Sequence, residues 1–249
     1  MNNCLRKVLL GLLGSCAFAS QLAAQELPLV VMQYYERKPF HYTVETGKES
    51  GLVVTPTEQA FAKLGIPIKW QLIPANRILD NLKRNESAVC SPGWYKNPQR
   101  LEYAQFSEPI YQDKPLVGLS NADFAVRQGI TAKELFARPQ TRLLMKQNFS
   151  QGAYMDKLIA ELPASQVQSA PVEVPNLIQM IHARRADLIV TTQEEVELYV
   201  EQAALQFKDF RVLVFPDVPA VEKRYVLCSK AVPASVMNKL NQAIGKKPL

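Results

Sequence analysis

Hydrophobic and polar positions along the chain predict strands and helices in turn. Apolar runs of about four to eight residues, such as DLIVT at 187–191, are typical of buried strands. Stretches with apolar residues three and four positions apart predict amphipathic helices between them. The strands are expected at 27–33, 66–73, 88–91, 116–119, 142–145, 172–174, 187–191, 210–215 and 225–228, and the helices at 55–64, 76–84, 131–137, 153–162, 176–185, 192–205 and 233–244.

Capping residues mark the starts of two of these helices. Thr55 is placed to cap the first, with Pro56 in its first turn and Glu58 completing a capping box. Gly65 is placed to end that helix, and TQEE at 192–195 predicts a second capping box. Strand–helix units with short connections predict α/β layers built on mostly parallel sheets.

The first 24 residues have the three parts of a secretory signal peptide. Arg6 and Lys7 form the basic part, residues 8–18 are apolar, and small residues at 19–24 precede a polar sequence. The apolar run is shorter than the roughly 20 residues that a membrane-spanning helix needs. We therefore expect cleavage after residue 24 and a protein that resides in the periplasm.

A second interpretation of this segment stays open. LGSC at 13–16 resembles a lipobox, in which Cys16 would become the lipid-modified first residue of the mature protein. Either form of processing takes the protein out of the cytoplasm.

Composition argues against several classes of function. Removal of residues 1–24 leaves 225 residues, enough for one or two domains, and lowers the formal net charge from +6 to +4. The basic residues are scattered, which is unlike a nucleic-acid-binding surface. His41 and His182 lack the spacing to a cysteine pair that zinc sites show. We expect no metal, no cofactor and no nucleic-acid partner.

Several segments occur in the order seen in one protein family. They are PF at 39–40, Gly51, GI at 65–66, Arg100 followed by FSEPIY at 106–111, and RAD at 185–187. Together they resemble the family 3 solute-binding proteins of bacteria. Cys90, Gly93 and Lys96, with CSK at 228–230, further resemble a cysteine-containing subgroup of that family.

The resemblance implies a two-lobed type II periplasmic binding protein fold, an α/β fold with mostly parallel sheets and an inter-lobe cleft. Residues 25–114 would form the first part of lobe 1, residues 115–217 lobe 2, and residues 218–249 the segment that returns to lobe 1. Ligands of open α/β sheets bind beyond the carboxyl ends of the strands. Closure of two lobes about a hinge then buries the ligand.

A disulfide follows from the same resemblance. The family topology returns the C-terminal strand, which holds Cys228, to lobe 1 and to the neighbourhood of the strand with Cys90. Facing side chains of adjacent strands have Cβ atoms about 4.5–5.5 Å apart, close enough for a disulfide after slight adjustment. Because an exported protein meets oxidising conditions, we expect Cys90 and Cys228 to be bonded. Two separate buried thiols are the alternative.

Arginine side chains are the main candidates for ligand binding. In the family, the arginine that matches Arg100 forms a bidentate pair with a ligand carboxylate. Arg77 stands just past a strand end and would face the same cleft, unless it is an ordinary solvated helix residue. We expect both guanidinium groups within reach of one small anion.

Aromatic and small residues complete the expected site. Tyr34, Tyr35 and Phe40 follow the first strand, where the family places an aromatic wall, and Trp94 would form a second wall. Ser150 lies just before a helix whose backbone N–H groups would attract an anion. The full set of expected ligand-binding residues is Tyr35, Phe40, Arg77, Gly93, Trp94, Tyr95, Arg100, Ser150 and Thr192.

Some positions differ from the amino-acid-binding members of the family. Those members carry Ser or Thr five and three residues before the arginine, where this chain has Tyr95 and Asn97. The family's acidic partner for an α-ammonium group falls at Thr192, which carries no charge. These differences disfavour a simple zwitterionic amino acid and favour a ligand recognised through its carboxylate.

Three kinds of function stay open. The first is a monomeric receptor that delivers an amino acid or another small carboxylate to an ABC permease or a membrane sensor. The second is an enzyme on the same scaffold, such as a dehydratase, although Glu36, His41 and Glu108 form no acid–base motif. The third is an interaction protein that binds no solute. We expect the first, with no catalytic residues.

Overall fold

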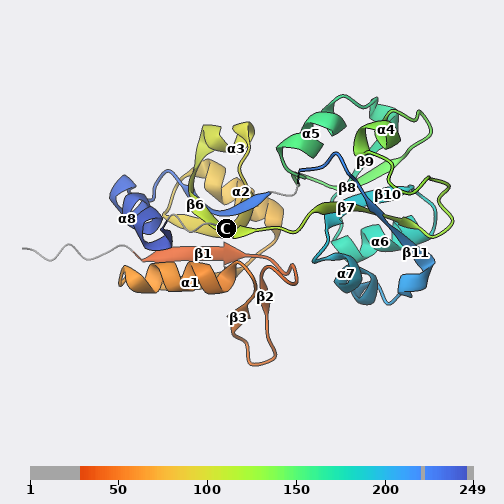
Figure 1. Ribbon diagram of the computed structural model, residues 1–249. Coiled ribbons are helices and arrows are strands. Elements are labelled where there is room, and N and C mark those ends of the chain that lie inside the picture. The colour runs from red at the N-terminus through yellow and green to blue at the C-terminus, as the bar shows by residue number, and fades with distance from the viewer. Residues whose placement is uncertain (1–28, 220–221, 246–249) are drawn as a thin grey trace, which may run out of the picture.

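The structure is a computed structural model that describes residues 29–219 and 222–245. The expected cleavage site after residue 24 and the alternative lipid site at Cys16 lie outside these residues. Among the described residues, no helix has the length and apolar character needed to cross a membrane. The described chain forms two α/β lobes that stand side by side in Figure 1, each built on one five-stranded sheet.

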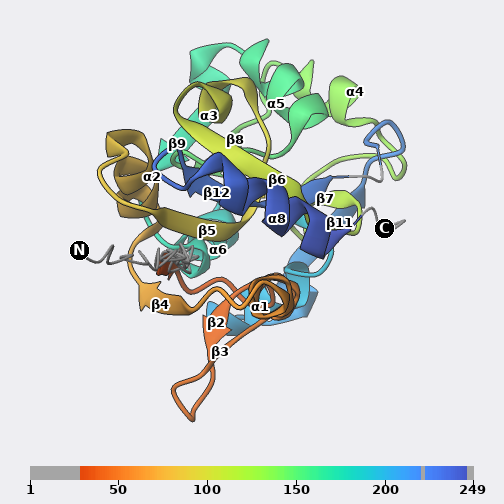
Figure 2. The same cartoon turned by 90° about the vertical axis from the view of Figure 1, so that its left-hand side faces the viewer.

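Lobe 1 contains the sheet β4-β1-β5-β12-β6. Its strands are β1 (Val30–Tyr34), β4 (Ile68–Leu72), β5 (Val89–Tyr95), β6 (Ala104–Gln112) and β12 (Lys223–Ser229). Its helices are α1 (Val54–Lys63), α2 (Ala75–Arg84), α3 (Pro98–Tyr103) and α8 (Ala234–Ile244). A hairpin of β2 (Tyr42–Thr43) and β3 (Glu49–Ser50) projects from this lobe in both ribbon views (Figures 1 and 2).

Lobe 2 contains the sheet β11-β7-β10-β8-β9. Its strands are β7 (Leu116–Asn121), β8 (Leu143–Lys146), β9 (Val167–Ala170), β10 (Leu188–Thr192) and β11 (Phe210–Val214). Its helices are α4 (Ala132–Phe136), α5 (Ala153–Ala160), α6 (Val174–His182) and α7 (Val196–Gln202), with short 3-10 turns at Ala164–Gln166 and Phe207–Asp209.

Both sheets are mixed, whereas the sequence predicted mostly parallel ones. In lobe 1, β1 pairs in parallel with β4 and β5, because helices make the connections among these strands. The returning strand β12 runs antiparallel to β5 and β6. In lobe 2, β8 is parallel to β9 and β10, and β7 is antiparallel to β10 and β11. The strands that follow the two lobe connections, β7 and β12, thus run against the other strands of their sheets. The domain boundaries at 114 and 217 stay a prediction.

Several predicted elements shift in the structure. Helix α1 begins at Val54 with Val53 as its cap, so the predicted capping role of Thr55 is wrong. The predicted capping box at 192–195 does not cap α7. The Thr192 hydroxyl donates to the Glu195 carboxylate instead, and the helix begins at Val196. The extended segment predicted at 172–174 is also wrong, because this stretch leads into α6.

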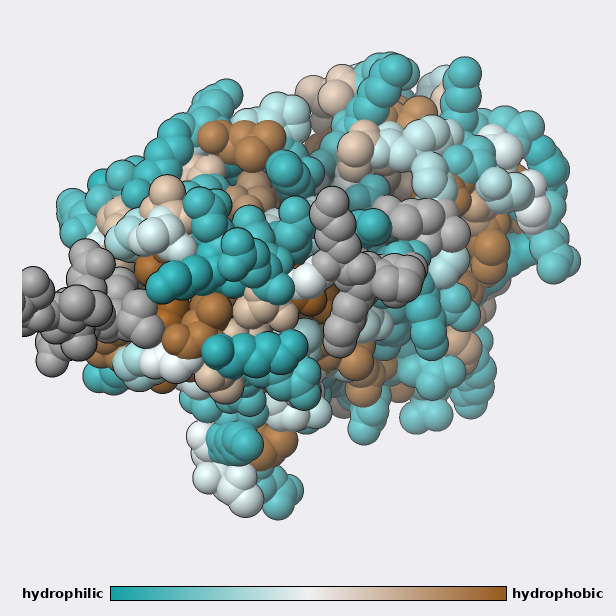
Figure 3. Space-filling model, turned by 60° about the vertical axis from the view of Figure 1, so that its left-hand side comes forward, coloured by the Kyte–Doolittle hydropathy of each residue, from teal (hydrophilic) through white to brown (hydrophobic). Residues whose placement is uncertain are grey.

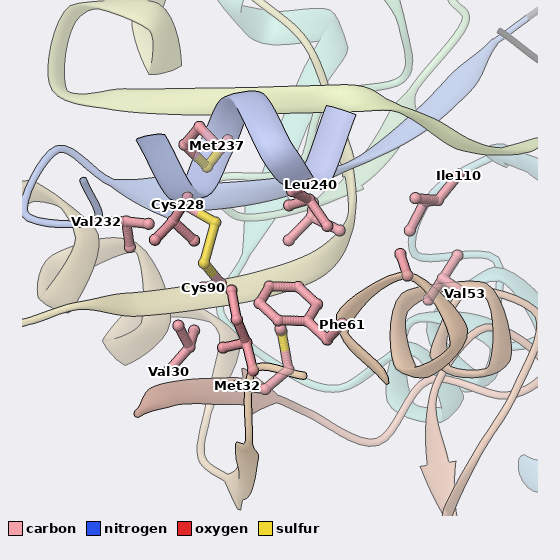
Figure 4. Packing of buried hydrophobic residues seen from close by; sticks show 14 of the residues in the cluster. Val30, Met32, Val53, Phe61, Cys90, Ile110, Cys228, Val232, Met237 and Leu240 are labelled. Atoms are coloured by element: carbon pink, nitrogen blue, oxygen red, sulfur yellow. A yellow bond between two sulfur atoms is a disulfide. The ribbon is translucent and has the colours of Figure 1, made fainter. Parts of the chain in front are cut away.

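The core of lobe 1 surrounds a disulfide. Cys90 of β5 and Cys228 of β12 face each other in register and are joined, so the predicted pairing is confirmed. Figure 4 shows the bond packed among apolar side chains of the strands, α1 and α8. Neighbouring strand residues alternate between two clusters: Cys228 points to the cluster with α1 and α8, and Leu227 to the cluster with α2.

Loss of the disulfide is expected to lower the free energy of unfolding by about 2–5 kcal/mol, because it constrains the unfolded chain between distant positions. The two cysteines are 138 residues apart. Urea denaturation of the chain from residue 25, with and without reductant, measures the effect. The Cys90→Ala/Cys228→Ala double variant should be destabilised and insensitive to reductant. Equal midpoints for the oxidised and reduced protein would contradict the expectation.

Candidate functional site

The lobes meet through loops that follow the carboxyl ends of their strands. From lobe 1 come the segment after β1 and the end of β5, and from lobe 2 the loops after β8 and β10. Two pockets lie between the lobes, of about 440 and about 220 Å3. The larger is lined by Tyr35, Glu36, Lys38, Leu72, Ile73, Pro74, Glu173, Pro175 and Gln202. The smaller is lined by Asn76, Leu79, Asp80, Lys83, Asn97, Gln99, Arg100, Tyr103, Asn148, Phe149, Ser150 and Asp156.

Phe149 of lobe 2 lines the smaller pocket and places its aromatic ring against two rings of lobe 1. Its ring centroid lies 5.8 Å from that of Tyr35 and 6.4 Å from that of Trp94, both in lobe 1. The preceding Asn148 has a φ of 63°, a left-handed conformation that asparagine tolerates better than most residues. Its side-chain amide donates to the Asn76 side chain at 3.0 Å. The apolar part of the lobe contact is therefore a cluster of three rings.

Arg100 places a buried guanidinium at the smaller pocket. Asn97 caps α3 by accepting from the Arg100 backbone N–H, and Pro98 occupies the first turn, so α3 starts where it can hold this side chain. The guanidinium lies 4.8 Å from the Trp94 ring centroid. It donates to the carbonyl oxygens of Tyr95 at 2.8 Å and of Asn148 at 3.3 Å. Arg100 therefore contacts both lobes.

The Arg100 charge has no carboxylate partner among the described residues. The residue is 4% exposed, and none of the ion pairs in the described chain includes it. Burial lowers the pKa of the Arg100 guanidinium, since desolvation disfavours a charge. The charge of Asp156, which lines the same pocket, acts in the opposite direction and favours the charged guanidinium.

The start of α5, beside the same pocket, is closed by the protein's own carboxylates. Asp156 accepts from the Gln151 backbone N–H at 2.7 Å and from the Ser150 hydroxyl. Glu222, in the segment that returns to lobe 1, also lies at the start of α5. Its carboxylate is so close to Gly152 that a Cβ at this position would overlap it. Burial, and then the charge of Asp156, raise the pKa of Glu222 to about 7. Backbone N–H groups near Ser150, which were expected to attract a ligand anion, are thus bonded to carboxylates of the protein itself.

A second arginine joins the lobes through an ion pair. The Nε and Nη2 atoms of Arg37, in lobe 1, donate to the two carboxylate oxygens of Glu195, in lobe 2, at 2.6 and 3.0 Å. The Glu195 side chain is inaccessible to solvent and also accepts from Thr191, Thr192 and Tyr199. Burial by itself would raise the pKa of Glu195, but the Arg37 charge lowers it to about 2.

A third arginine anchors the hinge side of lobe 1. Arg224 of β12 pairs with Asp113 through Nε at 2.7 Å, and both side chains are buried. Arg224 also donates to the Gly93 carbonyl at 2.9 Å, and Tyr95 donates its hydroxyl to Asp113. The Phe40 ring covers the guanidinium, with its centroid 3.6 Å away. This network lies at the first crossing between the lobes.

The acid–base candidates from the sequence have separate partners. His41 is buried and bonds through Nδ1 to the Tyr35 carbonyl, and burial lowers its pKa to about 3. The Glu36 carboxylate accepts from Thr43. Glu108 is exposed on β6. In the described part of the chain, no group of three or more His, Cys, Asp or Glu side chains is placed to hold a metal ion.

Comparison with known proteins assigns the family. Residues 29–166 match the family model of bacterial extracellular solute-binding proteins, family 3. The chain belongs to this family. The assignment agrees with a solute-binding receptor and with the two-lobed α/β fold, and the family is extracellular or periplasmic. No curated protein matches the chain.

Solved structures similar to this family 3 protein share its fold. The arginine-, lysine-, histidine-binding protein ArtJ from Geobacillus stearothermophilus has a TM-score of 0.68 at 17% identity, covering 87% of each chain. The substrate binding protein of an amino acid ABC transporter has a TM-score of 0.65 at 17% identity, covering 87% of this chain and 92% of its own. The ancestral amino-acid-binding protein AncCDT-1, a precursor of cyclohexadienyl dehydratase, has a TM-score of 0.64 at 19% identity, covering 87% of each chain.

The structure separates the expected ligand-binding residues into several places. Arg100 and Ser150 line the smaller pocket, Tyr35 lines the larger one, and Trp94 lies against Arg100 and Phe149. Phe40, Gly93 and Tyr95 contact the Arg224 network, and Thr192 is buried against Glu195. Arg77 is exposed on α2 and lines neither pocket, so the structure does not bring it together with Arg100.

Three residues of the cleft were missed from the sequence: Arg37, Phe149 and Glu195. Glu195 belongs to the segment read as a helix cap, and Arg37 stands between the aromatic residues and PF at 39–40. No local pattern shows that two residues separated by 158 positions will meet. A single Phe in a loop carries no periodic signal either.

Replacement of Arg224 by Met is expected to lower the free energy of unfolding by about 3–5 kcal/mol, because it leaves the Asp113 carboxylate buried without its counter-ion. The double variant Arg224→Met/Asp113→Leu should recover part of the loss, since neither charge then remains. Urea denaturation of the three proteins measures this. An Arg224→Met variant as stable as the double variant would contradict it.

Below pH 6.5, His41 is expected to make folding less favourable as the pH falls. The unfolded state then binds a proton at this position, whereas the folded state, with a pKa of about 3, does not. The contribution reaches about 1.4 kcal/mol per pH unit. Urea denaturation between pH 7 and pH 4 should show a weaker pH dependence for His41→Gln than for the wild type. The His182→Gln variant, at a partly exposed position, serves as control, and an unchanged slope in His41→Gln would contradict the expectation.

Proposed function

We propose that the protein captures a small carboxylate-bearing solute in the smaller pocket, where Arg100 binds the carboxylate. The observation that carries the proposal is a buried guanidinium without a carboxylate partner among the described residues, beside an inter-lobe pocket. A guanidinium matches a carboxylate through two parallel N–H···O bonds. The carbonyl oxygens that Arg100 contacts are neutral, and among the described residues no carboxylate lies at ion-pair distance from it.

The size and lining of the pocket support a small polar ligand. Its volume of about 220 Å3 is below the roughly 300–1,000 Å3 of pockets for drug-sized ligands. The amide side chains of Asn76, Asn97 and Asn148 would bond polar parts of the ligand, and Tyr103 offers a hydroxyl. The ligand class that we propose is an amino acid derivative or another small carboxylate.

Capture would depend on closure of the lobes. Arg100 and Asn76 belong to lobe 1, whereas Asn148 and Ser150 belong to lobe 2, so a ligand contacts both sets only when the lobes are together. A ligand that binds the closed state better shifts the population toward it. Binding is the only activity that this site is proposed to have.

Delivery would follow the pattern of the family. We propose that the exported protein acts as a monomer in the periplasm, and that it passes its ligand to an ABC permease or a membrane sensor. One of the similar structures is the binding protein of an amino acid ABC transporter. On the face shown in Figure 3, hydrophilic residues predominate and apolar ones occur in separate areas, as is usual for a monomer.

A panel of small carboxylates tested by thermal shift and then by calorimetry is expected to yield a ligand that raises the unfolding temperature. The Arg100→Gln variant should bind this ligand about 10- to 100-fold more weakly, as expected for loss of a hydrogen bond to a charged group. The Arg84→Gln variant is the matched control, because Arg84 is an exposed arginine at the end of α2 and lines neither pocket. Unchanged affinity in Arg100→Gln, or no response to any carboxylate, would argue against the proposal.

A further inference from the structure

Glu195 forms the centre of a cation site that faces lobe 1. It stands between β10 and α7, and three hydroxyl groups of its own lobe donate to its carboxylate: Thr191 at 2.9 Å, Thr192 at 3.0 Å, and Tyr199. These bonds fix the carboxylate inside lobe 2 whether or not a cation is present. A buried carboxylate held in this way binds a positive partner strongly, because little solvent competes for it.

The site has the shape that a guanidinium group requires. The carboxylate accepts two N–H groups side by side from Arg37, through Nε at 2.6 Å and Nη2 at 3.0 Å. The guanidinium carbon lies 5.3 Å from the ring centroid of Phe40 and 5.2 Å from that of Phe149. The two rings come from opposite lobes, so an aromatic face on each side attracts the cation.

The Arg37 guanidinium thus occupies the cation site at Glu195. It belongs to the chain, so it competes with any external cation at an effective concentration of about millimolar or more. The charges around it are also matched: Lys146 pairs with Glu173 at 2.5 Å, and Arg224 pairs with Asp113 at 2.7 Å. Among the described cleft residues, Arg100 is the buried cation that lacks a carboxylate partner.

We propose that Arg37 is a specificity-determining residue that occupies the cation site at Glu195 and so excludes ligands which carry an ammonium or guanidinium group there. The cleft is then left to anions. The part about anions rests on the proposed function, whereas the occupied cation site does not. Removal of the Arg37 side chain should open a site for a guanidinium compound of matching size.

Ethylguanidinium is the probe, because it replaces the side-chain atoms that Arg37→Ala removes. The Arg37→Ala variant is expected to bind it at least about tenfold more tightly than the wild type, as a charge-assisted bidentate pair would give. The variant Arg37→Ala/Glu195→Gln should lose this gain. Ethylurea, a neutral compound of similar shape, should bind none of the three proteins. Calorimetry and thermal shift measure all combinations.

Several results would overturn the inference. These are equal binding of ethylguanidinium by the wild type and Arg37→Ala, and equal binding by the single and double variants. If Arg37→Ala does not fold alone, it is refolded with each probe. Recovery with ethylguanidinium and not with ethylurea supports the inference, and recovery with neither overturns it. None of these measurements uses a carboxylate ligand or changes Arg100, so failure of the carboxylate proposal gives a different set of results.

Discussion

The burial of positive charge determines how the two lobes of this protein meet. Arg37, Arg100 and Arg224 all lie in or beside the cleft, and a buried cation is stable only when hydrogen bonds and an opposite charge compensate for lost hydration. Arg224 has its counter-ion inside lobe 1, and Arg37 has one in the opposite lobe. Arg100 has two carbonyl oxygens. Arg224 therefore supports lobe 1, Arg37 joins the two lobes, and Arg100 is the arginine that we propose to bind a ligand anion.

The contact between the lobes combines this charge with apolar area. The Phe149 ring meets Tyr35 and Trp94, and the Arg37–Glu195 pair lies beside it. Opening the lobes would break the pair and expose Glu195, although its three hydroxyl donors would remain with it. Part of the free energy of closure thus comes from the protein itself, and a ligand needs to supply only the difference between the two states.

The framework that holds these groups is the returning strand β12. It pairs with both β5 and β6, is bonded to β5 through Cys228, and carries Arg224 to Asp113 at the first crossing. The second crossing brings Glu222 to the start of α5. Strand β5 ends in Trp94 and Tyr95, just before α3. The same strand pairing therefore fixes the position of the segment that carries Arg100.

The sequence by itself determined the local elements and the type of fold. Helix α2 and strand β4 were predicted to within a few residues, because their periodicity depends on neighbouring side chains. Strand β6 was missed, since Pro109 interrupts its pattern and is tolerated only at an irregularity opposite Tyr225. The ordered motifs indicated the family, and that topology gave the disulfide.

Only the tertiary structure decided which charged groups share the cleft. Arg77 and Arg100 both follow strand ends, yet α2 turns Ile78, Leu79 and Leu82 inward and leaves Arg77 exposed. Arg37 and Glu195 are each ordinary in the sequence and become partners across 158 positions. The pattern of apolar residues reports which face of an element is buried, but the counter-ion of a buried charge depends on which distant segments the fold brings together.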